Sequence, residues 1–289
     1  MIHFHRYTWL YTLISALVIG AGLVSIFTYG YRFSIDFTGG STLIYKVKNT
    51  LAKSEIEKSI TTRKIKIVNV DVQQKTIHIQ TSAITDAQEK EIQTDIKKMS
   101  KGDVQVLRYE TVGPTLGKET GQKTIVAAVI AIAGILIYMS FSFKGFNYAL
   151  AAVLAMVHDF LVVLGSYSLL SRFFGAEFDL MFVTALLTTM SFSVHDTIVI
   201  FDKIREYIGG SKNTSAIASL ADKAVTETMI RSLNNSLTII FMMVSLLLMG
   251  GATIRFFIAT LLIGTITGTY SSPFIATPIL ILLEKRKNK

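Results

Sequence analysis

Asp196 is the residue whose position in this sequence most directly indicates a chemical role. It lies within 180–201, a stretch that is otherwise long and apolar enough to cross a bilayer. An ionisable side chain at membrane depth costs about 2.5–3.5 kcal/mol on insertion scales, so such residues usually move ions or pair with another charge. Arg231, at the start of a later apolar stretch, is the predicted partner. An arginine keeps its proton, so we expect Arg231 to hold Asp196 in its ionised form. When the Asp196 carboxylate is protonated, we expect Arg231 to release it.

Three more titratable residues lie inside apolar stretches. His195 precedes Asp196, and His158 and Asp159 stand near the middle of another stretch. Carboxylates and imidazoles change pKa with burial and with neighbouring charge. If they face the interior of a helix bundle at different depths, these residues form a proton relay.

Other interpretations of these residues are open. Arg231 could extend its charged end to the lipid headgroups. Asp196 could be a packing group that binds hydroxyls of its own helix, and His158 could be a buried hydrogen-bonding residue. A metal site is disfavoured because adjacent His and Asp residues point to different faces of a helix, and we expect no cofactor.

The composition is typical of a membrane protein with several spans. Of 289 residues, 51% are hydrophobic and 17% are charged, against about 25% charged in ordinary globular chains. The net charge of +9 fits the positive-inside bias better than nucleic-acid binding, because basic and aromatic residues do not cluster together. Cysteine is absent, which excludes disulfides and thiol catalysis. Without a phosphate-binding loop or a hydrolase motif, the chain is not expected to be an enzyme.

Six apolar stretches predict an all-α bundle of six transmembrane helices. They cover about 7–29, 124–141, 147–170, 179–201, 233–249 and 255–283. The first is interpreted as an uncleaved anchor, because it is longer than the apolar core of a signal peptide. The last contains Pro273 and Pro278 and is long enough to tilt or kink. The predicted domains are 1–31, 32–120 and 121–289, with a cytoplasmic loop at about 202–231.

The polar insert at 32–120 predicts a ferredoxin-like α+β domain. Alternating or apolar segments indicate strands at 41–47, 65–72, 76–80 and 103–109, and helices at 51–60 and 85–99. Thr85 and Gln88 make a capping box, and Gln73-Gln74 makes a turn. The resulting order β-α-β-β-α-β is that of split β-α-β folds.

Basic residues in the short loops fix the predicted orientation, since they are enriched on the cytoplasmic side. One side holds all but two of them: Arg6, Lys144, Lys203, Arg205, Lys212, Lys223, Lys285, Arg286, Lys287 and Lys289. The other side holds Arg172 and Arg255. Both termini are therefore expected in the cytoplasm and the polar insert outside it. The spacing of Gly264, Gly268 and Ser272 further predicts a stripe for close helix packing.

Six motifs, in order along nearly the whole chain, resemble the SecF members of the SecD/SecF family of protein-export membrane proteins, in the RND superfamily. The motifs are Asp36-Phe37-Thr38-Gly39-Gly40, V-G-P-x-L-G-x-E over 112–119, His158-Asp159, Asp196-Thr197 with 201–206, Arg231, and G-T-Y-S-S over 268–272. The chain departs from the family pattern at Phe192 and His195, where tyrosine and asparagine are usual. A second titratable group therefore adjoins Asp196.

The resemblance implies a function that the residues alone do not reveal. Family members pair with SecD, associate with the SecYEG channel and use the proton-motive force to draw unfolded polypeptides across the bacterial cytoplasmic membrane. Asp196 and Arg231 match the pair that serves proton flow there. Three other classes stay open from the residues: a small-molecule exporter of the RND type, a structural scaffold and an intramembrane enzyme.

Overall fold

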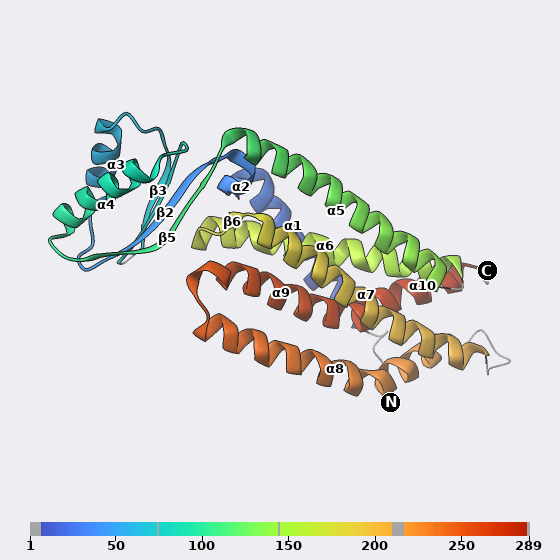
Figure 1. Ribbon diagram of the computed structural model, residues 1–289. Helices are drawn as coiled ribbons and strands as arrows, with labels where there is room; N and C mark the ends of the chain where they lie inside the picture. Colours follow the sequence, from blue (N-terminus) through green and yellow to red (C-terminus); the bar gives the residue numbers. More distant parts are fainter. Residues whose placement is uncertain (1–6, 74, 144, 210–216, 288–289) are drawn as a thin grey trace. The chain divides into compact units, whose positions relative to one another are not determined.

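The computed structural model describes residues 7–73, 75–143, 145–209 and 217–287. The chain divides into two compact units, one formed by Phe33–Val126 and the other by the rest of the described chain. Figure 1 shows the longer strands gathered in the first unit and most of the length of the long helices in the second.

The first unit contains a four-stranded antiparallel sheet. Its elements are β2 (Gly40–Val47), α3 (Lys53–Thr62), β3 (Ile67–Gln73), β4 (Thr76–Thr81), α4 (Asp86–Ser100) and β5 (Val104–Val112). The strands lie in the order β3-β4-β2-β5, and every neighbouring pair is antiparallel. Each predicted strand and helix of the insert has a counterpart here. The predicted turn at Gln73-Gln74 lies partly outside the described residues.

Alternation along the strands places the core of this unit on one face of the sheet. Leu43 and Tyr45 of β2 are fully buried and pack with isoleucines of α3 and α4. Helix α4 begins with the predicted capping box: the Gln88 amide donates to Thr85 Oγ1 at 3.4 Å, and the Thr85 amide donates to Gln88 Oε1 at 3.0 Å. The capping prediction is confirmed.

Two glycine-containing motifs of the first unit pack against each other. Gly39 follows the short helix α2 (Ile35–Thr38) with φ 70° and ψ 165°, a conformation essentially restricted to glycine. A Cβ atom there would lie 2.6 Å from the Cα of Pro114, the first residue of α5 (Pro114–Ser142). Gly117 approaches the Gly39 backbone equally closely, and the Phe37 ring lies beside Gly121. The backbones of the two motifs therefore touch with no room for side chains.

The contact of Gly39 with Pro114 and Gly117 is called the glycine corner below. Asp36 and Gly40, on either side of Gly39 in the same motif, support it. The Asp36 amide donates to the Ser34 hydroxyl, which caps α2. Gly40 has φ 127°, and a Cβ atom there would lie 2.5 Å from the Thr81 carbonyl oxygen. Only glycine therefore lets β2 start beside β4.

Gly39→Ala should destabilise this unit by about 1–3 kcal/mol, because alanine is strained at this φ and ψ and meets Pro114. Amide hydrogen exchange of residues 33–126 in the purified full chain measures the loss. The matched control is Gly113→Ala, where a Cβ atom meets nothing within 4 Å. Equal protection in the two variants would contradict the proposed glycine corner.

An ion pair joins α3 to α4. Arg63 donates to Asp95 Oδ2 at 2.8 Å, and Ser59 donates to the same oxygen at 2.9 Å. Partial burial raises the pKa of Asp95, but the hydrogen bonds from Arg63 and Ser59 and the Arg63 charge outweigh it, so the net shift is downward. The pair therefore stabilises the unit fully at pH values above the ordinary pKa of an aspartate. That contribution is lost as pH falls through the lowered pKa.

Asp95→Asn should lower the free energy of unfolding at neutral pH by about 1 kcal/mol or less. The difference from the parent chain should vanish as pH falls through the lowered pKa of Asp95. Hydrogen exchange of α3 and α4, corrected for the intrinsic effect of pH, provides the measurement. Asp103→Asn is the control, because the Asp103 side chain is 99% exposed and its ion pair with Lys97 is open to solvent. A pH-independent difference for Asp95→Asn would contradict the assignment.

The second unit consists mainly of long helices. They are α1 (Thr8–Tyr29), the C-terminal part of α5, α6 (Phe146–Phe174), α7 (Leu180–Gly209), α8 (Ile217–Met249), α9 (Arg255–Ser271) and α10 (Thr277–Lys287). The shorter elements among the described residues are β1 (Arg32–Phe33), β6 (Glu177–Phe178), η3 (Ala252–Ile254) and the π-helical turn η4 (Ser272–Ala276). Within the described residues, six helical segments are long and apolar enough to cross a membrane, as predicted.

Several helices extend beyond the apolar stretches that predicted them. Helix α5 begins at Pro114 rather than near 124, α7 continues to Gly209, and α8 already begins at Ile217. The described part of the predicted loop at 202–231 is therefore helical, and Gly210 lies outside the described residues. Charged and polar residues interrupt these extensions, so hydropathy detects only the uninterrupted apolar part of each helix.

Candidate functional site

Asp159 lies at the centre of a hydrogen-bonded cluster between three helices. Its side chain on α6 is buried, with the residue only 3% exposed. Oδ2 accepts hydrogen bonds from Ser193 of α7 and, at 2.6 Å, from Ser271 of α9. His158 Nδ1 lies 2.8 Å from Oδ1. A carboxylate removed from water needs such partners, and here they come from each of the packed helices.

His158 has one ring nitrogen bonded and one buried without a partner. With Nδ1 donating to Asp159, Nε2 carries a lone pair, and no described residue hydrogen-bonds to it. An imidazole in this tautomer can accept a proton at Nε2 while the carboxylate balances the charge. The proton-relay role of His158 and Asp159 stays a prediction.

Asp196 lies in a second cluster between α7 and α8. The residue is 6% exposed, and its Oδ2 accepts a hydrogen bond from Ser232 of α8. A cavity of about 320 Å³ is lined by Asp196 together with His195, Arg231 and Asn235. The carboxylate, the imidazole and the guanidinium of the predicted relay therefore share one cavity.

The structure differs from the sequence interpretation in the immediate partner of Asp196. Among the described residues, the salt bridges do not include one between Asp196 and Arg231, and the carboxylate binds the adjacent Ser232 hydroxyl instead. Both Arg231 and His195 are exposed side chains on the rim of the cavity. The Asp196–Arg231 pairing stays a prediction. Asp159 and Asp196 also bind different partners, so the described hydrogen bonds do not join them directly.

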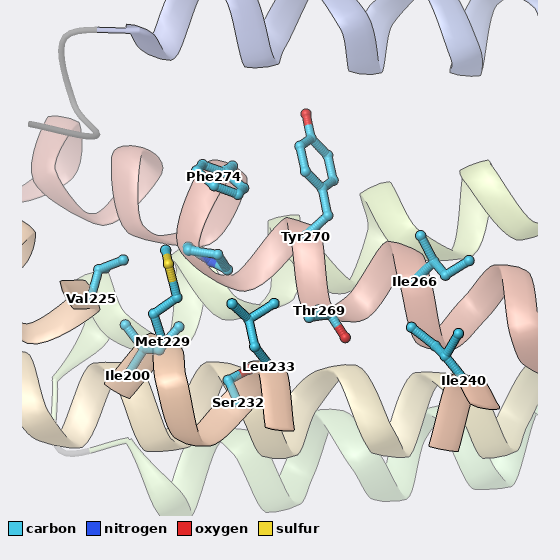
Figure 2. A pocket seen from close by; sticks show the side chains of 11 residues that line it. Ile200, Val225, Met229, Ser232, Leu233, Ile240, Ile266, Thr269, Tyr270 and Phe274 are labelled. Carbon is cyan, nitrogen blue, oxygen red and sulfur yellow. The ribbon is translucent and has the colours of Figure 1, made fainter. Parts of the chain in front are cut away.

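A largely apolar cavity of about 340 Å³ adjoins the Asp196 cluster (Figure 2). Ile200 and Ser232 line both cavities. The other residues that line the apolar cavity come from α8, α9 and η4, and they include Met229, Leu233 and Phe274. The Ser232 hydroxyl therefore stands between a polar and an apolar space.

Close helix packing holds α9 against α7 beside the Asp159 cluster. A Cβ atom at Gly264 of α9 would overlap the Thr189 side chain of α7, and one at Gly268 would lie 3.0 Å from Ser193 Cα. Ser272 Oγ lies 2.9 Å from Thr197 Oγ1. The predicted stripe therefore faces α7. A further close contact, Gly22 of α1 with Gly165 of α6, was not predicted from the sequence.

Gly264→Ala should destabilise the helical unit by about 1–3 kcal/mol, because the added methyl group forces α7 and α9 apart. The thermal unfolding temperature of the purified chain in detergent measures this. The matched control is Gly134→Ala of α5, where a Cβ atom meets nothing within 4 Å. A similar change in unfolding temperature for both would show that α7 and α9 do not depend on this contact.

Two family models match the chain. The model described as protein export membrane protein SecD/SecF, C-terminal, matches residues 91–286, and the SecD/SecF GG motif model matches residues 24–50. The first covers more than half of the chain.

Curated relatives and solved structures agree with these matches. The protein translocase subunit SecF of Thermobaculum terrenum is 35% identical, covering 99% of this chain and 95% of the relative. SecF of Anaerolinea thermophila is 34% identical over 96% of this chain and 92% of the relative. The crystal structure of SecDF from Thermus thermophilus, a translocon-associated membrane protein, has a TM-score of 0.86 and 27% identity. That match covers 100% of this chain and 39% of the solved chain.

Proposed function

Because this chain belongs to the SecD/SecF family of protein-export membrane proteins, we propose that it is an accessory subunit of the Sec protein translocase. It works with a SecD subunit beside the SecYEG channel and uses the proton-motive force to promote export of unfolded polypeptides. The relatives named SecF and the likeness to SecDF support the accessory role. The chain is a multi-pass protein of the bacterial membrane.

Asp196 carries the proton-coupling part of the proposal. Its buried carboxylate, in a helix apolar enough to span a membrane, borders a cavity that also holds His195 and the Arg231 guanidinium. In one state Asp196 is ionised and held by Ser232 and the Arg231 charge. A proton from outside, passed near His158 and Asp159, neutralises it, and α7 and α8 shift. Release of the proton to the cytoplasm restores the first state.

The energy available is sufficient for such a switch. Each charge moved across the membrane supplies about 2.3 kcal/mol per 100 mV, to which the pH gradient adds. One proton therefore biases a two-state element by a few-fold to some tens of fold.

The first unit is the part proposed to act outside the cytoplasm, as a ferredoxin-like domain that engages the emerging chain. The order β-α-β-β-α-β and the strand order β3-β4-β2-β5 support this fold. The distribution of basic residues in the short loops supports an orientation with both termini in the cytoplasm.

Asp196→Asn should abolish the proton-gradient dependence of export while leaving protein level and assembly with SecD normal. The amide keeps the shape of the side chain but cannot bind and release a proton. The measurement is export into membrane vesicles, with and without a gradient, from cells lacking the native copy. Asp202→Asn is the control, because Asp202 lies on the same helix but is exposed and paired with Arg205.

Two other results would redirect the proposal. Unchanged gradient dependence in Asp196→Asn would assign Asp196 to helix packing, a role that its bond to Ser232 would by itself satisfy. Loss of the protein rather than of its activity would favour a structural scaffold.

A further inference from the structure

Four consecutive hydroxyl-bearing residues cover the end of α9 and the first residue of η4: Thr269, Tyr270, Ser271 and Ser272. Consecutive residues of an α-helix point about 100° apart, so four of them together cover all sides of the helix. Helix α9 packs against α6, α7 and α8. Side chains from this segment can therefore reach a different helix in each direction.

Two of the four side chains bind α6 and α7. Ser271 donates to Asp159 Oδ2 at 2.6 Å. Ser272 Oγ lies 2.9 Å from Thr197 Oγ1. The two serines and their partners, Asp159 and Thr197, are all buried. The carboxylate of α6 is thus linked, through two adjacent serines, to a hydroxyl of α7.

The other two side chains bind α8 and α1. Thr269 Oγ1 lies 2.7 Å from Ser236 Oγ of α8. The Tyr270 hydroxyl donates to the Tyr11 carbonyl oxygen at 3.0 Å and lies 3.1 Å from Ser15 Oγ, both on α1. Figure 2 shows Thr269 and Tyr270 pointing to opposite sides of α9, with Tyr270 directed toward α1. Each of the four hydroxyls therefore contacts a different neighbouring helix.

The helix changes its winding at the last residue of this segment. Residues Ser272–Ala276 form a π turn, in which the Thr277 amide donates to the Ser272 carbonyl oxygen. Pro273 in this turn has no amide hydrogen to donate. Single π turns inside helices occur frequently at functional sites. Here the turn begins at Ser272, the residue that contacts Thr197 of α7.

We propose that residues 269–272 form a hydroxyl junction that passes a displacement of α6 at Asp159 to α1, α7 and α8. The proposal rests on the proton relay described above and assigns this segment the coupling of that relay to helix movement. Ser193, His158 and Ser271 are hydrogen-bonded to Asp159. Any change in that cluster therefore acts directly on Ser271 and on its neighbours in the junction. The residues of the junction are positioning residues.

Thr269 offers the sharpest test, because its shape and its hydroxyl can be changed separately. Thr269→Val keeps the shape and removes the bond to Ser236, whereas Thr269→Ser keeps the hydroxyl. Thr267→Val is the matched control, since Thr267 and Thr269 both contact a backbone carbonyl oxygen one turn earlier in α9 and, among the described residues, Thr267 makes no bond to α8. Ser236→Ala removes the same contact from the α8 side and serves if Thr269→Val does not fold.

The measurement is gradient-stimulated export by the full chain assembled with SecD. Thr269→Val and Ser236→Ala should each reduce the stimulation by about fivefold or more, and their combination should cost little more than either alone. Thr269→Ser and Thr267→Val should retain it.

Helix movement can be followed in the same preparations. The chain has no cysteine, so Val157→Cys on α6 and Met242→Cys on α8, which are 45% and 53% exposed in the parent, accept spin labels selectively. A gradient should change the distance between the labels in the parent and in Thr267→Val, but not in Thr269→Val.

The outcomes separate the junction from the relay. If Asp196→Asn loses gradient dependence while Thr269→Val and Ser236→Ala behave like Thr267→Val, the junction alone is overturned. If Asp196→Asn keeps gradient dependence, the relay is overturned and the junction with it.

Discussion

The helical unit depends on one constraint, the need to satisfy the Asp159 carboxylate away from water. A buried carboxylate is tolerated only with hydrogen-bond donors around it. Ser193 and Ser271 supply them from two other helices. Short hydroxyl side chains reach the carboxylate only if α6, α7 and α9 approach closely, and Gly264 and Gly268 permit that approach. The polar cluster and the small-residue packing are therefore two aspects of one arrangement.

Lipid chains are as apolar as leucine, so the hydrophobic effect gives membrane helices little reason to associate. The contacts of α9 reflect this, because small residues and hydroxyls predominate where it meets α6, α7 and α8. The first unit is built differently. There, buried isoleucines of α3, α4 and β4 fill one face of the sheet. The helical unit is thus packed through small and hydroxyl-bearing residues, and the first unit through large apolar side chains. The proposed function places the former in the membrane and the latter in water.

Much of the fold was predictable, because apolar length and strand alternation are local properties. Six spans and the elements of the insert follow from them. The extensions of α7 to Gly209 and of α8 back to Ile217 were not predictable in this way. Charged residues lower the hydropathy there, so the helices continue without an apolar signal. The titratable residues of the site could be recognised by type, whereas Ser232 as the partner of Asp196 could not. A serine 36 positions away has no periodic relation to the carboxylate.

The π turn at Ser272–Ala276 sets the rotational phase of everything after it. A π turn holds about one residue more than an α turn, so α10 is rotated by about 100° relative to an uninterrupted continuation of α9. Leu280 and Ile281 are buried in the rotation that exists. In a helix without the π turn, the side chains of Leu280 and Ile281 would point about 100° away around the helix axis. The turn thus allows one continuous span to present its serines to the polar cluster and its leucine to the apolar core.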